Sequence, residues 1–487
     1  MLTSRCVTFP GFPGFPGFSA LSVCAFIACA LLACDDTTGA GQNADNVNNV
    51  NNVNNINNIN NVNNVNNVNN VNNVNNLNQL QAAILTPAPD SEVLEGKAVT
   101  LSAAVSGGVP PYVADWDIGG VPLAEGENPG ETVIPECGDR TLTLTVTDAD
   151  GAVATDEISL RVLDLNAGLR PYFGHLHSHS GISDGEGTPD EVLTWARDVV
   201  GVDFYGMADH AEQMSDSEWA LVAQKTAEYS QPGVFVALRG FEWSHPWNGH
   251  MCIYNTADFT SAISDIWISY IYDWLVEHQG LAQFNHPGRE NGVFDDLDYE
   301  ASVAPNMFAI ETGNRGNGNA EGEFLPYYIQ ALDNGWRLAP TSNQDNHSLS
   351  FNSHRTAYWA AELSQDSLLQ AMRDRAFYSS DDPNAEVMLR VGGVTMGGLL
   401  TPAAQGPLEF QVKVVDDEPI QRLELITRAG AVAAMVEPPA GTMRFLWFPV
   451  VNVSSDGWYF LKVTLEDTLD GEGPIQVVVT APIYIRF

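Results

Sequence analysis

The chain has 487 residues, 44% of them hydrophobic, and a formal net charge of −40. This length is enough for two or three domains with apolar cores. The strongly negative charge excludes a protein that binds nucleic acid across its surface, because such a surface repels phosphate backbones.

Residues 1–33 are predicted to be a signal peptide. Within them, SALSVCAFIACALLA at 19–33 is an apolar run too short to cross a membrane as a stable helix. The run ends in LLAC, which resembles a bacterial lipobox, in which Cys34 would become the lipidated first residue of the mature protein. An ordinary secretory signal is the alternative, because the basic character before the run rests on Arg5 alone. We therefore expect an exported cell-envelope protein held at a membrane by a lipid on Cys34.

Two segments follow before the first histidine. Residues 35–82 are predicted to be a disordered tether, because Asn-Asn-Val and Asn-Asn-Ile repeat over 43–78 with a period that suits neither helix nor strand. Residues 83–165 predict an immunoglobulin-like β-sandwich, since apolar and polar residues alternate between Gly, Pro and Asp turns. Trp116 is expected to be buried in it. The run LTVTDADGAVATDEISLRV resembles the last hairpin of PKD-type domains, which are common spacers on exported proteins.

Residues 166–382 contain all ten histidines of the chain. Strand-like runs alternate here with helical patterns, two of which begin with the capping boxes TPDE at 188–191 and SDSE at 215–218. This alternation predicts an α/β architecture, and a barrel in particular. Residues 383–487 return to short strand-like runs and predict a small C-terminal β-sandwich.

Imidazoles and carboxylates stand at the C-terminal ends of five predicted strands. PYFGHLHSH ends in His175 and His177, VDFYGMADH in Asp209 and His210, VFVALRGFEW in Glu242, GLAQFNHP in His286, and WRLAPTSNQDNH in Asp345 and His347. Barrel enzymes build their sites at this face. His175 and His177, two residues apart on a strand, are expected to point the same way and chelate one ion. Imidazole nitrogens combined with carboxylate oxygens suit Zn²⁺, Mn²⁺ or Fe²⁺. Asp209 is expected to orient a neighbouring ligand.

The motifs HxH, SDG, (A/T)DH, GFEW, NHP and DxH occur here in an order that resembles the PHP (polymerase and histidinol phosphatase) superfamily of metallohydrolases. The resemblance covers about residues 170–400, and GFEWSHPWNGHMCIYN is most similar to the branch of carbaryl-esterase-type enzymes. It implies a distorted (β/α)7 barrel with two or three divalent metal ions. It assigns His175, His177, Glu242 and Asp345 to one metal, Glu242, His250 and His286 to a second, and Asp184, His210 and His347 to a third.

Three further residues are candidates for catalysis. His179 and His354 suit proton transfer or the support of a ligand, and Arg289 suits the clamping of a phosphate. Arg289, like Arg315 and Arg355, could equally pair with a carboxylate. We predict a metal-dependent hydrolase of a small-molecule ester, preferably a phosphoester, that uses a metal-activated water. The alternatives are a hydrolase of carboxylic or carbamate esters with the same centre, and a surface-binding lipoprotein without catalysis.

Overall fold

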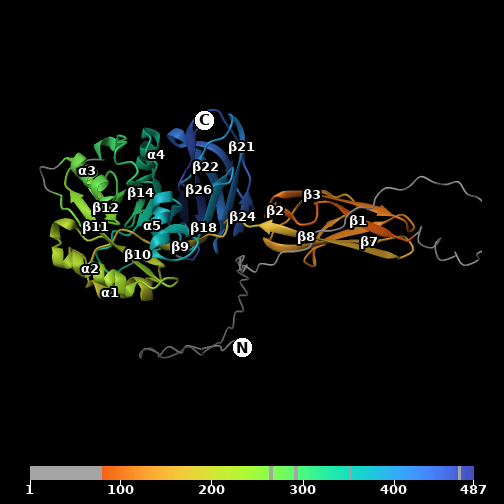
Figure 1. Ribbon diagram of the computed structural model, residues 1–487, viewed down its shortest axis with the longest axis horizontal. Coiled ribbons are helices and arrows are strands. Elements are labelled where there is room, and N and C mark those ends of the chain that lie inside the picture. Colours follow the sequence, from red (N-terminus) through yellow and green to blue (C-terminus); the bar gives the residue numbers. More distant parts are fainter. Residues whose placement is uncertain (1–78, 263–266, 290–293, 351, 470–472) are drawn as a thin grey trace, which may run out of the picture. The chain divides into compact units, whose positions relative to one another are not determined.

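A computed structural model describes residues 79–262, 267–289, 294–350, 352–469 and 473–487 (Figure 1). The predicted signal peptide, the lipobox at Cys34 and nearly all of the predicted tether lie outside these residues. In the part of the chain that the structure describes, no helix is both long enough and apolar enough to cross a membrane.

The first described region is all β. Its strands are β1 (Gln81–Thr86), β2 (Ser91–Leu94), β3 (Ala98–Ser106), β4 (Val113–Ile118), β5 (Val121–Glu125), β6 (Gly130–Val133), β7 (Gly138–Thr147) and β8 (Val153–Leu163). They form a sheet in the order β1-β3-β6 and another in the order β2-β8-β7-β4-β5. Alternate residues of β7, Leu142, Leu144 and Val146, are fully buried in the core between them. Trp116 is 1% exposed, as predicted.

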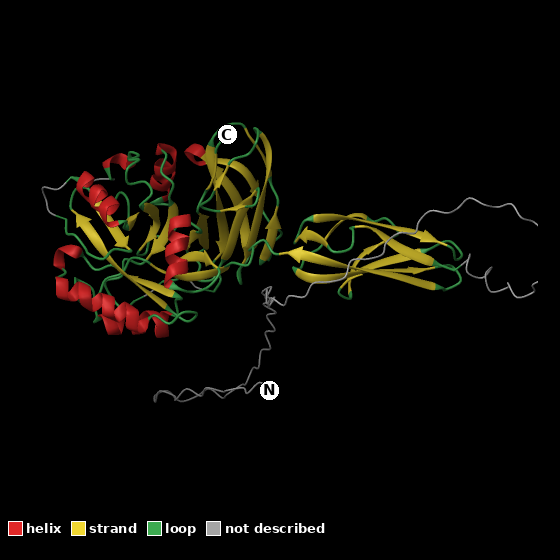
Figure 2. Ribbon diagram, in the orientation of Figure 1, coloured by secondary structure: helices red, strands yellow, loops and turns green. Residues whose placement is uncertain are grey.

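The second region alternates strands with helices (Figure 2). Its elements are β9 (Arg170–His175), α1 (Pro189–Trp195), η3 (Ala196–Val200), β10 (Phe204–Met207), η4 (Ala211–Gln213), α2 (Asp216–Tyr229), β11 (Val236–His245), β12 (Gly249–Tyr254), α3 (Ile268–His278), β13 (Leu281–Phe284), η5 (Asp295–Leu297), β14 (Met307–Asn314), α4 (Leu325–Asn334), β15 (Ala339–Asn343), β16 (Arg355–Ala360), α5 (Gln365–Asp374) and β17 (Phe377–Ser380). Helices α1 and α2 begin at the two predicted capping boxes, and in both boxes the reciprocal hydrogen bonds form.

The strands of this region form a mixed, curled sheet. Strands β9 to β11 pair in parallel, as do β13 to β15, whereas β12 runs antiparallel between β11 and β13. A hairpin joins β11 to β12 without room for a helix, so the chain departs here from a uniform βα alternation. Beyond β9 the sheet continues antiparallel through β16 and β17. The Thr356 hydroxyl of β16 also bonds the backbone of Ser342 in β15 at 3.0 Å, which links β15 to β16.

The described residues of the C-terminal region are all β apart from one turn of 3₁₀ helix, η6 (Arg428–Gly430). Its strands are β18 (Glu386–Val391), β19 (Val394–Thr395), β20 (Leu399–Leu400), β21 (Gly406–Val415), β22 (Ile420–Thr427), β23 (Ala431–Val436), β24 (Arg444–Trp447), β25 (Val450–Val453), β26 (Gly457–Glu466), β27 (Ile475–Thr480) and β28 (Ile483–Ile485). Strand β27 pairs with β17, so one sheet runs from the α/β region into β26, β22 and β23. A continuous sheet therefore crosses the domain boundary predicted between residues 382 and 383.

Candidate metal centre

The carboxylate of Glu242, on β11, lies at the centre of five histidines. Its Oε1 is 3.1 Å from His177 Nε2, 3.3 Å from His250 Nδ1 and 3.7 Å from His286 Nε2, and its Oε2 is 2.8 Å from His210 Nδ1 and 3.6 Å from His179 Nε2. Burial opposes ionisation of Glu242, but the charge of His177 and the hydrogen bonds from the histidines outweigh it and hold the pKa of this carboxyl well below its usual range. Each oxygen thus faces its own set of ring nitrogens, as in a carboxylate that bridges two ions.

Asp345 is a second shared carboxylate, just beyond the end of β15. Its Oδ1 lies 3.3 Å from His177 Nε2 and 3.2 Å from His179 Nε2. Its Oδ2 pairs with Arg289 Nη1 at 2.7 Å and with Arg315 Nε at 3.0 Å. Burial opposes the ionisation of Asp345, but His177 and the hydrogen bond with His179 prevail and lower its pKa. One oxygen therefore faces the histidines while the other is held by arginines.

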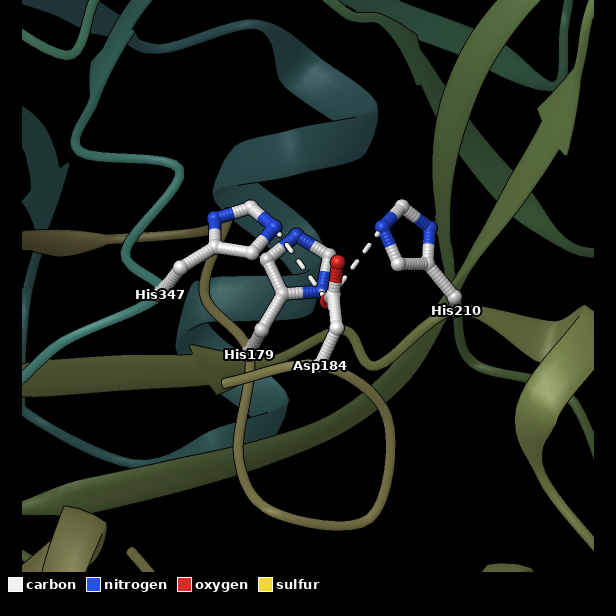
Figure 3. A group of neighbouring side chains, drawn as sticks. All are labelled: His179, Asp184, His210 and His347. Carbon is white, nitrogen blue, oxygen red and sulfur yellow. Dashed lines mark ion pairs between the residues drawn. The ribbon is translucent and has the colours of Figure 1, made fainter. Parts of the chain in front are cut away.

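A third group forms around Asp184 (Figure 3). Its Oδ1 is 3.3 Å from His347 Nε2, 3.6 Å from His210 Nε2 and 4.0 Å from His179 Nδ1. The side chain of Asp184 is 46% exposed, whereas His179 is buried. This group is therefore the side of the cluster that opens to solvent.

The structure changes the first pair of predicted ligands. Strand β9 ends at His175, so the strand alternation expected for His175 and His177 does not continue to His177. His175 is fully buried with its Nε2 3.2 Å from Arg355 Nη1, and it belongs to none of the groups around Glu242, Asp345 or Asp184. Burial, reinforced by Arg355, lowers the pKa of His175 well below its usual value. We therefore replace His175 and His177 by His177 and His179 as the first pair of candidate ligands.

A buried carboxylate outside the predicted ligand set fixes the ring of His177. Glu311, on β14, accepts a hydrogen bond from His177 Nδ1 at 2.9 Å. It also accepts bonds from the His286 backbone amide and from Asn314 Nδ2, both at 2.7 Å. With Nδ1 bound in this way, the buried Nε2 of His177 faces Glu242 Oε1 at 3.1 Å and Asp345 Oδ1 at 3.3 Å. A carboxylate behind the far nitrogen of an imidazole is typical of metal-ligating histidines, so the residues present fit a metal.

Asp209 supports the turn that carries His179 and Asp184. Its carboxylate accepts hydrogen bonds from the Ser180 amide at 2.7 Å, the Ser180 hydroxyl at 2.9 Å and the Ser183 hydroxyl at 2.7 Å. This geometry agrees with the expected orienting role of Asp209. The turn also needs Gly185, where a Cβ would lie 2.6 Å from the carbonyl of His179.

The three catalytic candidates lie in different surroundings. His179 belongs to the cluster itself. Arg289 pairs with the carboxylate of Asp345, which is the alternative to phosphate binding that the sequence left open. It also donates a hydrogen bond to Asn314. His354 is 5% exposed with its Nδ1 3.3 Å from Asn352 Nδ2, and the structure does not bring it into any of the ligand groups.

A cavity of about 540 Å³ adjoins the exposed side of the cluster. Polar residues dominate its lining, which includes Asp184, Arg315, Gln344, Asp345, Asn346 and His347. The side chain of Arg315 is 52% exposed there. The cavity thus suits a small polar ligand.

No family model matches the sequence, and no curated protein matches it. Among solved structures, the chain is similar to a two-domain protein containing a predicted PHP-like metal-dependent phosphoesterase from Bacteroides vulgatus, with 14% identity, coverage of 66% of this chain and 96% of that chain, and a TM-score of 0.37. It is also similar to PsfC from Pseudomonas syringae, with 16% identity, coverage of 39% and 82%, and a TM-score of 0.31.

Proposed function

We propose that the chain is a metal-dependent hydrolase of ester bonds, preferably phosphoesters, and a member of the PHP superfamily. We further propose that the curled sheet from β9 to β17 is the distorted (β/α)7 barrel of that superfamily. The observation that carries the proposal is the division of the Glu242 carboxylate between two sets of histidines. The order of the sequence motifs supports it independently.

The cluster offers ligands for three ions when each imidazole serves one ion only. One ion would be held by Glu242, His250 and His286, a second by Asp184, His210 and His347, and a third by His177, His179 and Asp345, which the other Glu242 oxygen faces. Because these donors are imidazole nitrogens and carboxylate oxygens, Zn²⁺, Mn²⁺ and Fe²⁺ fit them best. Such ions supply Lewis acidity and allow water to act as a nucleophile near neutral pH.

The chain's own residues position the substrate and the ligands. Glu311 holds the His177 ring in one orientation, and Asp209 holds the turn of His179. Arg315 lines the cavity beside the cluster, and its guanidinium suits a non-bridging phosphate oxygen. This arginine and the polar lining favour a phosphoester over a neutral carboxylic ester.

The test compares hydrolysis of an aryl phosphomonoester, an aryl phosphodiester and an aryl acetate by the purified chain. Metal is stripped and then restored. His286→Ala is measured beside the control His278→Ala, because the His278 ring stacks on Trp274 outside the cluster. We expect metal-dependent phosphoester turnover that His286→Ala abolishes and His278→Ala retains. Unchanged activity in His286→Ala would refute the proposal, and turnover of the acetate alone would favour the carboxylic esterase.

We also propose that the protein is exported and anchored through a lipid on Cys34, with the PKD-type region as a spacer. The support is the lipobox-like LLAC sequence and the repetitive segment after it. Mass spectrometry of the protein from cell envelopes tests this, since a diacylglyceryl group on Cys34 is expected and Cys34→Ala should release the chain from the membrane. An unmodified cysteine at that position would contradict the anchor.

A further inference from the structure

A second group of acidic side chains shares no residue with the candidate metal centre and comes from the two turns that precede β18 and follow β21. Asp382 follows β17, and Asp416 and Asp417 lie between β21 and β22. One carboxylate oxygen from each of the three residues lies within 4.8 Å of the others. Asp382 is fully buried and Asp416 is 8% exposed, whereas Asp417 reaches solvent.

The local hydrogen bonds organise both turns but leave part of the group unsatisfied. Asp382 accepts from the backbone amides of Asn384 at 2.7 Å and Ala385 at 2.6 Å, and Asp416 Oδ1 accepts from the Glu418 amide at 2.9 Å. Asp416 Oδ2 is buried and has no hydrogen-bond partner among the described residues. Glu418 Oε2, on the same turn, is buried and likewise has none among them. Unsatisfied buried carboxylate oxygens are costly, so something outside the protein chain is expected to satisfy them.

The charges of the group also require a positively charged partner or a proton. Among the described residues, neither Asp416 nor Asp417 forms an ion pair with a lysine or arginine. Burial, followed by the charge of Asp382, raises the pKa of Asp416 to about 8. Two buried carboxylates and a third beside them repel one another unless a proton or a cation lies between them.

We propose that Asp382, Asp416 and Asp417 bind one Ca²⁺ ion that joins the turn after β17 to the turn between β21 and β22. Every donor in the group is an oxygen, which suits a hard cation and not the ions that imidazoles prefer. The exposed side of Asp417 leaves room for the water molecules that complete calcium coordination. This site is independent of the hydrolase proposed above, because it shares none of its residues.

The test uses the whole chain with Ca²⁺ alone as the probe, after treatment with a chelator. Equilibrium dialysis against radioactive calcium and thermal denaturation are run on the wild type, on Asp416→Asn and on Asp273→Asn, which removes the same charge from the exposed face of α3. We expect the wild type to bind calcium and its Tm to rise by about 5 °C when free Ca²⁺ is roughly 100-fold above the Kd. Asp416→Asn should lose this calcium and this rise, while Asp273→Asn keeps both.

Without calcium, the effect of Asp416→Asn on the Tm should be reversed. Because Asp416→Asn removes one of the repelling charges, its Tm without calcium should equal or exceed that of the wild type. Asp417→Asn, at an exposed position, provides a variant with little risk to folding and should weaken Ca²⁺ binding about tenfold.

Three results would overturn the proposal. Equal calcium binding by Asp416→Asn and the wild type is one, and unchanged affinity in Asp417→Asn is another. The third is a wild-type Tm that does not change with Ca²⁺ but rises as the pH falls through about 8. That result would show that a proton, and not a cation, satisfies Asp416.

Discussion

The cluster around Glu242 and the group around Asp416 both bury carboxylates, but they compensate for the burial differently. Glu242 faces five ring nitrogens and also accepts a hydrogen bond from Asn285 Nδ2 at 2.7 Å. Asp416 lies beside the carboxylates of Asp382 and Asp417 and accepts a hydrogen bond from one backbone amide. The same cost of desolvation therefore leads to a site for a borderline metal in the first case and for a hard cation in the second.

Removal of Glu242 should have the largest effect. Glu242→Gln takes away the oxygen charge that both histidine sets face, so we expect loss of the transition metals and a fall in kcat of more than about 1000-fold. Steady-state kinetics and metal analysis check this. Glu277→Gln on the exposed side of α3 is the matched control and should change neither, while calcium binding at Asp416 should survive in both variants.

Separate alanine substitutions of the first and last histidines of HLHSH, His175 and His179, test which of them is a ligand. His179→Ala should lower the metal content and reduce turnover more than about 100-fold, because His179 contacts three carboxylates of the cluster. His175→Ala should keep the metal content, because His175 bonds Arg355 instead. Metal loss in His175→Ala with retention in His179→Ala would restore the ligand pair that the sequence predicted.

Substitution of Glu311 should have a smaller effect, because it acts through His177. Glu311→Gln keeps the shape of the side chain but weakens the hydrogen bond to His177 Nδ1, so metal affinity should fall about 10- to 100-fold. Competition with a chelator of known affinity measures this. An affinity equal to that of the wild type would show that Glu311 does not position His177.

The smallest expected effect concerns substrate binding. Arg315→Gln should raise KM for the aryl phosphate about tenfold and leave KM for the aryl acetate unchanged, because only the phosphate carries charge for the guanidinium. Arg373→Gln on the exposed face of α5 is the control. A parallel change for both esters would count against Arg315 as a phosphate contact.

The elements that depend on local sequence were predictable. Both capping boxes start helices, and β10, β13 and β15 end just before His210, His286 and Asp345. Strand ends that meet at one edge bring together residues far apart in the chain, so most of the cluster follows from the positions of the strands.

Other features depend on contacts that a single sequence does not display. The choice between His175 and His179 depends on where β9 ends, and that end is one residue in a run of alternating histidines. Glu311 is a single acid within the apolar run NMFAIETGN, which predicts a buried strand. A charge in such a strand must have a partner, and this was the indication in the sequence that Glu311 matters. The continuity of the sheet through β17 and β27 joins segments about a hundred residues apart, and strand periodicity contains no information on such pairing.

The most direct test of the central claim is a count of transition-metal ions per chain by mass spectrometry, on the wild type and on Glu242→Gln after reconstitution with Zn²⁺ or Mn²⁺. The division of the Glu242 carboxylate between two sets of histidines predicts about two or three ions in the wild type and a loss of ions in the variant. Fewer than about one ion in the wild type, or equal counts in both proteins, would contradict a metal centre built on Glu242.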